Sequence, residues 1–314
     1  MQNKHYDFIF FFEKFVTTIV SNYKIKHADK KVFIAFDHMH ISNKFTILLF
    51  ALRLGKVGIP IWFRIFKYND SNAFQLSIFQ DGISFCHNLF KNNTPDCNII
   101  FLADRFWGNH TKVMEYIHLL GDTYYIRAKS NLLVSVYDEK NNKYVNKHLY
   151  DLNHYVHHSA FYNNISFTKN HFVTNLAISQ SKDHNEPYYI VTNANPNTAV
   201  KEYSKRFGTV EFNFKNEKSN GFFLEETQLK SLKSVESLFV CICIAQILLT
   251  ILGIDYSKNQ KCYIKSIKIR TSKIVKARRI HIFSYFHIGL MIISYAFKMI
   301  NPPNLFHRII LYDV

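Results

Sequence analysis

The pattern of hydrophobic and polar positions divides the first 130 residues into alternating strand-like and helix-like segments. Apolar residues recur at helical spacing over 73–90 and 109–120, and the first 30 residues hold a further helix followed by a polar link. Short apolar runs rich in β-branched and aromatic residues predict strands at 32–36, 45–54, 59–66, 98–103 and 123–129. The predicted order is therefore three strands, helix, strand, helix and strand.

The texture of the chain changes between about residues 131 and 186. Short alternating segments such as 132–137 and 164–168 are separated by clusters of Asn, Lys and Asp, which is typical of antiparallel strands. A buried-strand pattern returns at 188–192, and Asn195-Pro196 predicts a helix start because Asn caps well and Pro suits the first helical position. We therefore expect an α/β fold with a mixed sheet and an antiparallel β insertion.

Two apolar helices are predicted near the end of the chain. Residues 235–254 are barely long enough to span a membrane, and Glu236 and Gln246 lie inside this segment. Apolar positions continue upstream at helical spacing, which favours a long helix buried in a protein core. A membrane-associated protein anchored by this segment stays the alternative. Residues 283–299 predict the second helix, and the apolar run at 8–12 lacks the form of a signal peptide.

Composition and charge narrow the class of protein. The 314 residues are 48% hydrophobic, enough for a sizeable core, and carry a formal net charge of +16. This charge indicates a polyanionic partner, either nucleic acid or an anionic membrane surface. Five scattered cysteines without CxxC spacing argue against a disulfide framework and a zinc site. Residues 256–280 contain nine Lys or Arg and no acid, which favours phosphate binding over a merely solvated surface.

Two aspartates each follow a predicted strand. Asp37 comes after the run 32–36 and Asp104 after 98–103, and carboxylates at the ends of adjacent strands converge at one edge of a sheet. A third carboxylate from a helix packed on that edge, Glu211, would complete an oxygen-rich cage suited to Mg²⁺. The chain has 23 acidic residues and turns favour Asp, so only the local contexts distinguish this set.

The segment 203–225 contains a tyrosine, an arginine, a glutamate and lysines in a predicted helical stretch. On a helix, Glu211, Lys215 and Lys218 would share one face. A carboxylate beside two ammonium groups suits a site that holds a cation and a phosphate together, and an exposed ion-paired helix is the alternative.

These contexts together resemble the DDE transposases of the IS-four type over about residues 30 to 255. The matching features are Asp37 after a strand, the sequence Ala103-Asp-Arg-Phe-Trp107, and Tyr203…Arg206…Glu211…Lys218 followed by Gly221-Phe-Phe-Leu-Glu225. The resemblance implies a ribonuclease-H-like fold with a β insertion before the glutamate helix.

The resemblance also implies the chemistry. Asp37, Asp104 and Glu211 would be the catalytic residues and would hold two Mg²⁺ ions, with Mn²⁺ able to substitute. Tyr203, Arg206 and Lys218 would contact DNA. The implied reaction is hydrolysis of a phosphodiester at the ends of a mobile element, followed by attack of the freed 3′-hydroxyl on target DNA.

The resemblance further implies partners and an organisation of the chain. We expect double-stranded DNA as partner, a homodimer in the DNA complex, no membrane, and a prokaryotic-type cytoplasmic protein associated with the nucleoid. The expected domains are an N-terminal helical remnant (1–30), the catalytic domain (31–255) and a basic segment with an apolar helix (256–314). Within the basic segment, DNA binding is assigned to Lys273, Lys276, Arg278 and Arg279.

Two features depart from the family pattern. Four residues, not three, separate Arg206 from Glu211, and we expect Gly208 to end one helix and Thr209 to open the next. Only 36 residues precede Asp37, where family members carry a helical DNA-binding domain. A catalytically inactive remnant that only binds DNA is therefore the alternative function, and Glu202 and Glu217 are rival candidates for the third ligand.

Histidines and one tryptophan supply weaker candidates. His38 and His40, and the cluster of His154, His157 and His158, lack acid or cysteine partners at ligand spacing, so surface or phosphate-facing roles are favoured over a metal site. Trp107 could stack on a distorted DNA base or pack in the core.

Overall fold

The computed structural model describes most of the chain and divides it into two compact units. The described residues are 7–21, 30–138, 141–152, 158–180, 186–215, 222–259, 264–271, 274–281 and 284–298. One unit comprises residues 27–227, and the other comprises 1–26 together with 228–314. The chain thus divides into compact units near residue 227, and the domains expected at 1–30, 31–255 and 256–314 stay a prediction.

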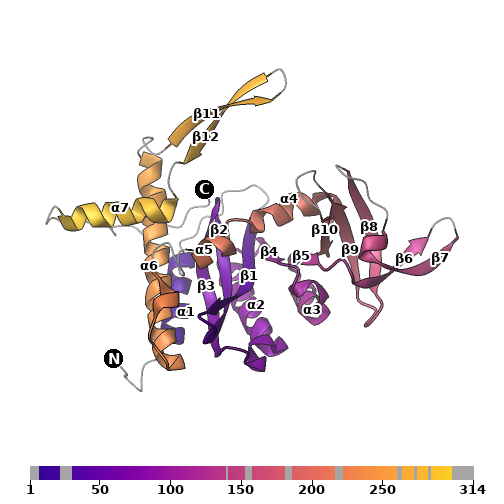
Figure 1. The fold of residues 1–314 in the computed structure, drawn as a ribbon, viewed down its shortest axis with the longest axis horizontal. Coiled ribbons are helices and arrows are strands. Elements are labelled where there is room, and N and C mark those ends of the chain that lie inside the picture. Colours follow the sequence, from indigo (N-terminus) through magenta and orange to yellow (C-terminus); the bar gives the residue numbers. More distant parts are fainter. Residues whose placement is uncertain are drawn as a thin grey trace. The chain divides into compact units, whose positions relative to one another are not determined.

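The unit 27–227 is built on one ten-stranded sheet (Figure 1), ordered β3-β2-β1-β4-β5-β10-β9-β8-β6-β7. Strands β1, β4 and β5 are parallel, whereas β2 and β10 run antiparallel to their neighbours β1 and β5. The first five strands are β1 (Lys31–Ile41), β2 (Phe45–Leu54), β3 (Val57–Lys67), β4 (Asn98–Ala103) and β5 (Thr123–Ala128). The order 3-2-1-4-5 with these directions is ribonuclease-H-like, so the predicted mixed α/β fold is confirmed.

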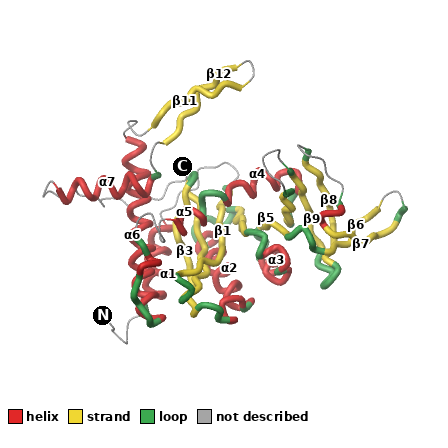
Figure 2. The backbone as a smooth tube through the Cα atoms, in the orientation of Figure 1, coloured by secondary structure: helices red, strands yellow, loops and turns green. Residues whose placement is uncertain are grey.

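The predicted antiparallel insertion extends this sheet beyond β10 (Tyr188–Thr192). Figure 2 shows that the insertion consists mainly of strands, drawn in yellow, whereas strands and helices alternate before it. Its members are β6 (Leu133–Asp138), β7 (Lys143–His148), β8 (Ser159–Phe167) and β9 (Val173–Ser179), all paired antiparallel. The insertion therefore continues the main sheet and does not form a separate one.

Helices cover both faces of the sheet. On one face, α4 (Ala199–Tyr203) and α5 (Val210–Lys215) pack over a core that includes Ala35 and Leu102. On the other, α2 (Leu76–Lys91) and α3 (Thr111–Leu119) follow β3 and β4. Short 3₁₀ turns complete the unit: η1 (Ser71–Phe74), η2 (Trp107–Asn109), η3 (Leu149–Asp151), η4 (Pro196–Thr198), η5 (Ser204–Arg206) and η7 (Leu224–Glu226).

An aromatic cluster fills the α2 side of the sheet. Trp107 is fully buried, with its ring centroid 4.4 Å from that of Phe79 and 5.6 Å from that of Phe36. Of the two roles considered for Trp107, core packing is the one that the structure supports. Trp107 also contacts His38, whose Nε2 lies 3.0 Å from the carbonyl oxygen of Ala73.

His38 differs from its expected role at the surface. Burial among these rings lowers its pKa to about 4, so the imidazole is neutral near pH 7 and serves packing. His40 is exposed and its Nδ1 lies 3.0 Å from Oγ1 of Thr46. His154 and His157 lie outside the described residues, and His158 is exposed.

Strand β1 is longer than expected, which corrects the position of Asp37. The hydrophobic pattern ended the strand at residue 36, but β1 continues through Asp37 to Ile41. The reason is that β2 still supplies an antiparallel partner, from Asp37↔Leu49 to Ile41↔Phe45, whereas the parallel pairing with β4 stops at Ala35↔Leu102. Asp37 is therefore inside its strand but just beyond the end of the parallel ladder.

The second unit contains helices and one hairpin. Its elements are α1 (Phe8–Ser21), α6 (Leu232–Asn259), β11 (Ile264–Thr271), β12 (Ile274–His281) and α7 (Tyr285–Lys298). Helices α6 and α7 approach closely, since a Cβ on Gly253 would lie 1.8 Å from the carbonyl oxygen of Tyr285, and one on Gly289 would lie 2.0 Å from that of Leu249. The basic segment forms an antiparallel ribbon, for which the sequence analysis had assigned charge but no strands.

One helix in the described part of the chain is long and apolar enough to cross a membrane by length and composition. It covers Leu232–Ser257; its most apolar 18-residue window has a mean hydropathy of 2.6, and 61% of that window is buried within the protein. The predicted long helix is present, and core helices of this kind pass the same test.

Gly208 gives a direct test of how the fold positions the segment after β10. Its φ is +79°, and a Cβ there would lie 2.9 Å from the carbonyl oxygen of Lys56. Gly208→Ala should lower the free energy of unfolding by more than about 1–2 kcal/mol, because the left-handed backbone and the contact both oppose a side chain. Chemical denaturation would measure this change.

Gly121→Ala is the matched control for that variant. Gly121 has φ +76°, and a Cβ on this residue would have no other atom within 4 Å, so its substitution carries the backbone cost alone. Equal losses in the two variants would show that the close approach to Lys56 contributes nothing.

Candidate active site

The sheet brings Asp37 and Asp104 to one edge and one face. The last parallel pair between β1 and β4 is Ala35↔Leu102, and each aspartate lies two residues further along its chain. Side chains alternate with a period of two, so both aspartates continue the face that carries Ala35 and Leu102. That face is the one covered by α4 and α5. The two carboxylates lie close together because of the pairing register of β1 with β4 and the alternation of side chains along each strand, and less because the strands end there.

The segment that carries the third carboxylate is two short helices with a break between them. Asn195 caps the first turn, accepting a hydrogen bond from the Asn197 amide at 2.9 Å, and η4, α4 and η5 follow without interruption. Phe207 is extended (φ −62°, ψ 132°), Gly208 is left-handed, and α5 begins at Val210. The break predicted at Gly208 is confirmed, whereas a single helix from Tyr203 to Lys218 is not formed.

Arg206 joins two of the three predicted catalytic acids. Its Nη2 lies 2.7 Å from Oδ2 of Asp37, and its Nη1 lies 2.5 Å from Oε1 of Glu211. The Arg206 side chain is only 8% exposed, and its Nε is buried with no hydrogen-bond partner among the described residues. The guanidinium thus bridges β1 and α5 and leaves one donor unsatisfied.

The charges at this site do not balance. The pKa of Asp37 is raised to about 6, mainly by burial and also by the nearby carboxylates of Asp104 and Glu211, while Arg206 and the His38 backbone N–H act to lower it. Burial alone would lower the pKa of Arg206, but Glu211 and Asp37 more than offset it, so this pKa is raised. Three carboxylates therefore surround one cation, an arrangement that additional positive charge would stabilise.

Asp104 lines a pocket beside this bridge. Its Oδ1 accepts a hydrogen bond from the Phe106 backbone N–H at 2.8 Å, which fixes the turn after β4. The pocket has a volume of about 450 Å³ and is lined by Asp104, Arg105, Arg127, Glu186, Tyr188, Tyr203, Arg206 and Phe207. Tyr203 is 3% exposed, and burial raises its pKa to about 12, so its hydroxyl stays protonated at neutral pH.

Glu202 occupies a different environment from Glu211. It is buried on α4, where its Oε2 lies 2.6 Å from Nζ of Lys205 and its Oε1 lies 3.4 Å from Nζ of Lys31. Both oxygens are therefore paired with lysines, while Glu211 shares Arg206 with Asp37. This geometry separates Glu211 from one of its two rivals. The other rival, Glu217, lies outside the described residues.

The structure describes only some of the other residues that were predicted to contact DNA. Lys218 and Lys273 lie outside the described residues. Lys276, Arg278 and Arg279 all lie on β12 of the second unit, and each is paired with a residue of β11 in the hairpin. Tyr203 and Arg206 both lie at the edge that carries Asp37, but Arg206 is engaged by carboxylates.

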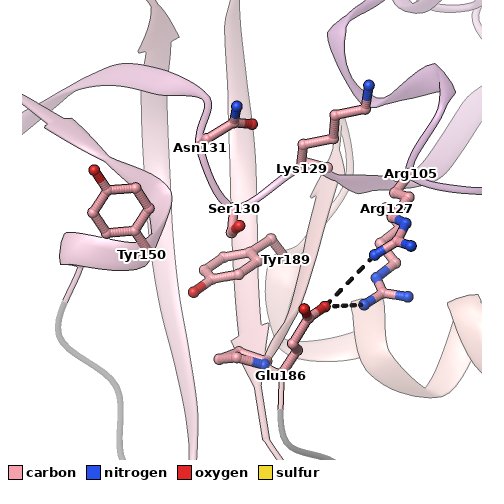
Figure 3. Close-up of a pocket in the computed structure, with 10 residues that line it drawn as sticks. Arg105, Arg127, Lys129, Ser130, Asn131, Tyr150, Glu186 and Tyr189 are labelled. Carbon is pink, nitrogen blue, oxygen red and sulfur yellow. Dashed lines mark ion pairs between the residues drawn. The ribbon is translucent and has the colours of Figure 1, made fainter.

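A second pocket, which the sequence analysis missed, adjoins the first. Figure 3 shows Arg105 and Arg127 on one side of it, Tyr150 on the other, and Glu186 below. Its volume is about 560 Å³, and Arg105, Arg127 and Glu186 also line the pocket that holds Asp104. The only sequence signal was Arg105 directly after Asp104, because Arg127 and Glu186 lie in elements read as ordinary strand and linker.

The donor atoms fit a divalent cation in their chemistry. Mg²⁺ prefers carboxylate oxygens, and Asp37, Asp104 and Glu211 supply them. A bound cation would also lower the raised pKa of Asp37. Within the described ranges, however, no three His, Cys, Asp or Glu side chains are grouped to share one metal ion. Two of the three carboxylates are paired with Arg206 instead, so a cation would have to compete with its guanidinium.

Comparisons with known proteins identify no family for this chain. No family model and no curated protein sequence matches this chain. Similar solved structures include Argonaute of Marinitoga piezophila in complex with guide RNA and target DNA, with 14% identity and a TM-score of 0.29. They also include Endonuclease V of Ciona intestinalis in complex with inosine-containing DNA, with 13% identity and a TM-score of 0.29.

The extent of these matches is limited. The alignment covers 58% of this chain and 25% of the Argonaute chain, so the match spans about a quarter of Argonaute. For Endonuclease V it covers 62% of this chain and 87% of that chain. At such TM-scores the similarities carry no argument about activity, and the fold assignment depends on the strand order.

The raised pKa of Asp37 predicts a pH-dependent stability. A carboxyl group with a raised folded-state pKa stabilises the fold below its ordinary value of 3.8, and this contribution is lost as pH rises through about 6. The stability of Asp37→Asn relative to wild type should therefore increase by up to about 3 kcal/mol between pH 4 and pH 7.5. Denaturant unfolding in EDTA at both pH values measures this difference.

The control for this experiment is Asp96→Asn, which removes a carboxylate paired with Lys30 at the surface, its side chain 81% exposed. Its pH dependence corrects for the loss of one negative charge anywhere on the protein. If the stability of Asp37→Asn relative to wild type changes with pH no more than that of the control, then Asp37 is not destabilised by burial and by nearby carboxylates as described.

Proposed function

We propose that this chain is a metal-dependent DNA-cleaving enzyme of the DDE transposase type. The observation that carries the proposal is the bridge from the buried Arg206 to Asp37 and Glu211, beside Asp104, whose charge helps to raise the pKa of Asp37. The ribonuclease-H-like strand order supports it, because the two aspartates take their places from adjacent parallel strands. The net charge of +16 supports a polyanionic substrate.

The three carboxylates would hold Mg²⁺, with Mn²⁺ as a substitute, and the bound ions would supply activation of the attacking oxygen and stabilisation of the leaving oxygen. The protein residues fix the geometry. Asp37 is held by the β1–β2 pairing and Asp104 by its hydrogen bond to the Phe106 N–H, while Glu211 enters from α5 after the break at Gly208.

Arg206 has a role that changes between the free and the loaded protein. In the free protein its buried guanidinium pairs with Asp37 and with Glu211, whose side chain is 46% exposed, and so offsets the repulsion between the two carboxylates. A planar guanidinium also suits a phosphate group, and its unsatisfied Nε is a donor available for one. We infer that Arg206 transfers from the carboxylates to a DNA phosphate when cations and substrate bind.

A catalytically inactive protein that only binds DNA is the second candidate. The observation in its favour is the same bridge, since an arginine that neutralises two acids would also preserve a site that has lost its metal. The two candidates differ in what the acids do: in the remnant they stabilise the fold, and in the enzyme they are required for cleavage.

Strand cleavage should depend on each of the three acids. We expect wild-type protein to nick supercoiled plasmid with Mg²⁺ or Mn²⁺ and not with EDTA, because the carboxylates require a cation to act. Asp37→Asn, Asp104→Asn and Glu211→Gln should each reduce the nicking rate by at least about 100-fold while DNA binding is kept or slightly tightened. An agarose-gel time course measures the rate.

Glu202→Gln is the matched control, because it neutralises a buried glutamate four residues before Arg206 that pairs with lysines. It should retain cleavage. Metal-independent nicking, or loss of cleavage in Glu202→Gln with retention in Glu211→Gln, would overturn the assignment of the third acid. Absence of nicking under all conditions, with DNA binding intact, would favour the inactive remnant.

The basic hairpin should contribute to binding through phosphates. Residues Lys276, Arg278 and Arg279 lie on β12, and neutralised phosphates release counterions, which makes binding salt-dependent. Substituting these three and Lys273 with Gln should reduce the slope of log affinity against log salt by about 0.9 for each phosphate that the hairpin no longer neutralises. Fluorescence anisotropy with duplex DNA measures the slope, and an unchanged slope would mean that the hairpin is only solvated.

A further inference from the structure

The pocket that adjoins the acids contains a carboxylate shared by two arginines. Oε2 of Glu186 lies 3.5 Å from Nη1 of Arg105 and 3.9 Å from Nη2 of Arg127 (Figure 3). A single oxygen anion placed between two guanidinium groups is also the arrangement in which arginines bind a phosphate. The carboxylate therefore marks a position that suits a phosphate oxygen.

Arg127 differs from Glu186 in how firmly the fold holds its side chain. Arg127 is paired with Ile190 across β5 and β10, so Tyr188, two residues earlier, shares its face of the sheet. The Arg127 guanidinium lies 4.2 Å from the centre of the Tyr188 ring, and its side chain is 20% exposed. The Glu186 side chain is 73% exposed. The cation is fixed by packing, and the carboxylate is the exposed partner.

The charge in this pocket favours an added anion. Arg105, Arg127 and Lys129 line it together with one acid, Glu186. An exposed carboxylate–arginine pair contributes little to stability, so its replacement by a phosphate costs little. The 560 Å³ volume is typical of pockets for one small group and admits a single strand. Tyr150 on the far wall is 52% exposed and offers aromatic surface to its bases.

We propose that the Arg105–Arg127 pair binds a backbone phosphate of a single DNA strand, and that Glu186 occupies this phosphate position until the strand displaces it. The strand would continue from Asp104 through the shared arginines towards Tyr150. This proposal deepens the proposed function by assigning a substrate track, and it requires DNA binding but no cleavage. Glu186 is thus a residue that weakens binding and favours strands whose phosphate reaches both arginines.

The test is equilibrium binding of a fluorescein-labelled oligo-dT of about 12 nucleotides, measured by anisotropy in EDTA so that metal and cleavage play no part. Glu186→Gln should bind about two- to fivefold more tightly than wild type, because an exposed ion pair no longer has to be broken. Arg105→Gln and Arg127→Gln should each weaken binding and lower the salt slope by about 0.7. Arg105 is 59% exposed, so its variant should fold even if Arg127→Gln does not.

Asp96→Asn is the matched control, since it also removes one negative charge from an exposed ion pair, with Lys30. Equal affinities of Glu186→Gln and Asp96→Asn would overturn the proposal, because the gain would then reflect net charge alone. Competition with unlabelled thymidine monophosphate distinguishes a site for the phosphate of a free nucleotide from a site for the backbone phosphate of a strand. Displacement of the oligonucleotide by the mononucleotide at similar nucleotide concentration would also overturn it, whereas displacement only by longer strands supports it.

A failure here is distinguishable from a failure of the proposed function. Suppose that metal-dependent nicking is lost in Asp37→Asn and that Glu186→Gln has no effect on binding. The proposed function would then stand, and the proposed path of the strand past Arg105 and Arg127 would be wrong. The Glu186 effect without any nicking would support the track in a protein that only binds DNA.

Discussion

The bridge from Arg206 to Asp37 and Glu211 is the interaction on which the site depends. It connects residues 169 apart in the chain, and it neutralises the largely buried Asp37 as well as the exposed Glu211. Without this cation, Asp37 and Glu211 would repel each other and also Asp104, which already raises the Asp37 pKa. The short helix α5 is therefore held against the sheet by charge as well as by its buried Val210.

The two faces of the sheet carry different kinds of residues. The α2 side holds the aromatic cluster of Phe36, Phe79 and Trp107, which fixes β1 against its neighbours. The α4–α5 side carries the acids, because Asp37 and Asp104 lie on the same face as Ala35 and Leu102. Consecutive residues of β1 thus alternate between the two faces, so Phe36 packs in the aromatic cluster while its neighbour Asp37 pairs with Arg206.

Features set by neighbouring residues could be predicted from the sequence, whereas those set by contacts between distant segments could not. Strands 45–54, 98–103 and 188–192 were predicted at their observed bounds, because buried strands give uninterrupted apolar runs. The end of β1 was not, since continued pairing with β2 decides it. The approximate place of the acids followed from local context, but the Arg206 bridge and the Glu186 pair join distant segments that no spacing reveals. The hairpin β11–β12 was not predicted because the segment was interpreted by its charge alone, although apolar and basic residues alternate over 267–270.

The central claim is that Asp37, Asp104 and Glu211 hold divalent cations that compete with Arg206. Titration of Mn²⁺ into the DNA-free protein, followed by electron paramagnetic resonance of the unbound ion, tests it most directly. The account predicts saturable binding that is lost in Asp37→Asn, kept in Glu202→Gln and tightened in Arg206→Gln, because that variant removes the competing guanidinium. Mn²⁺ binding that is absent in all four proteins, or unaffected by Asp37→Asn, would contradict it.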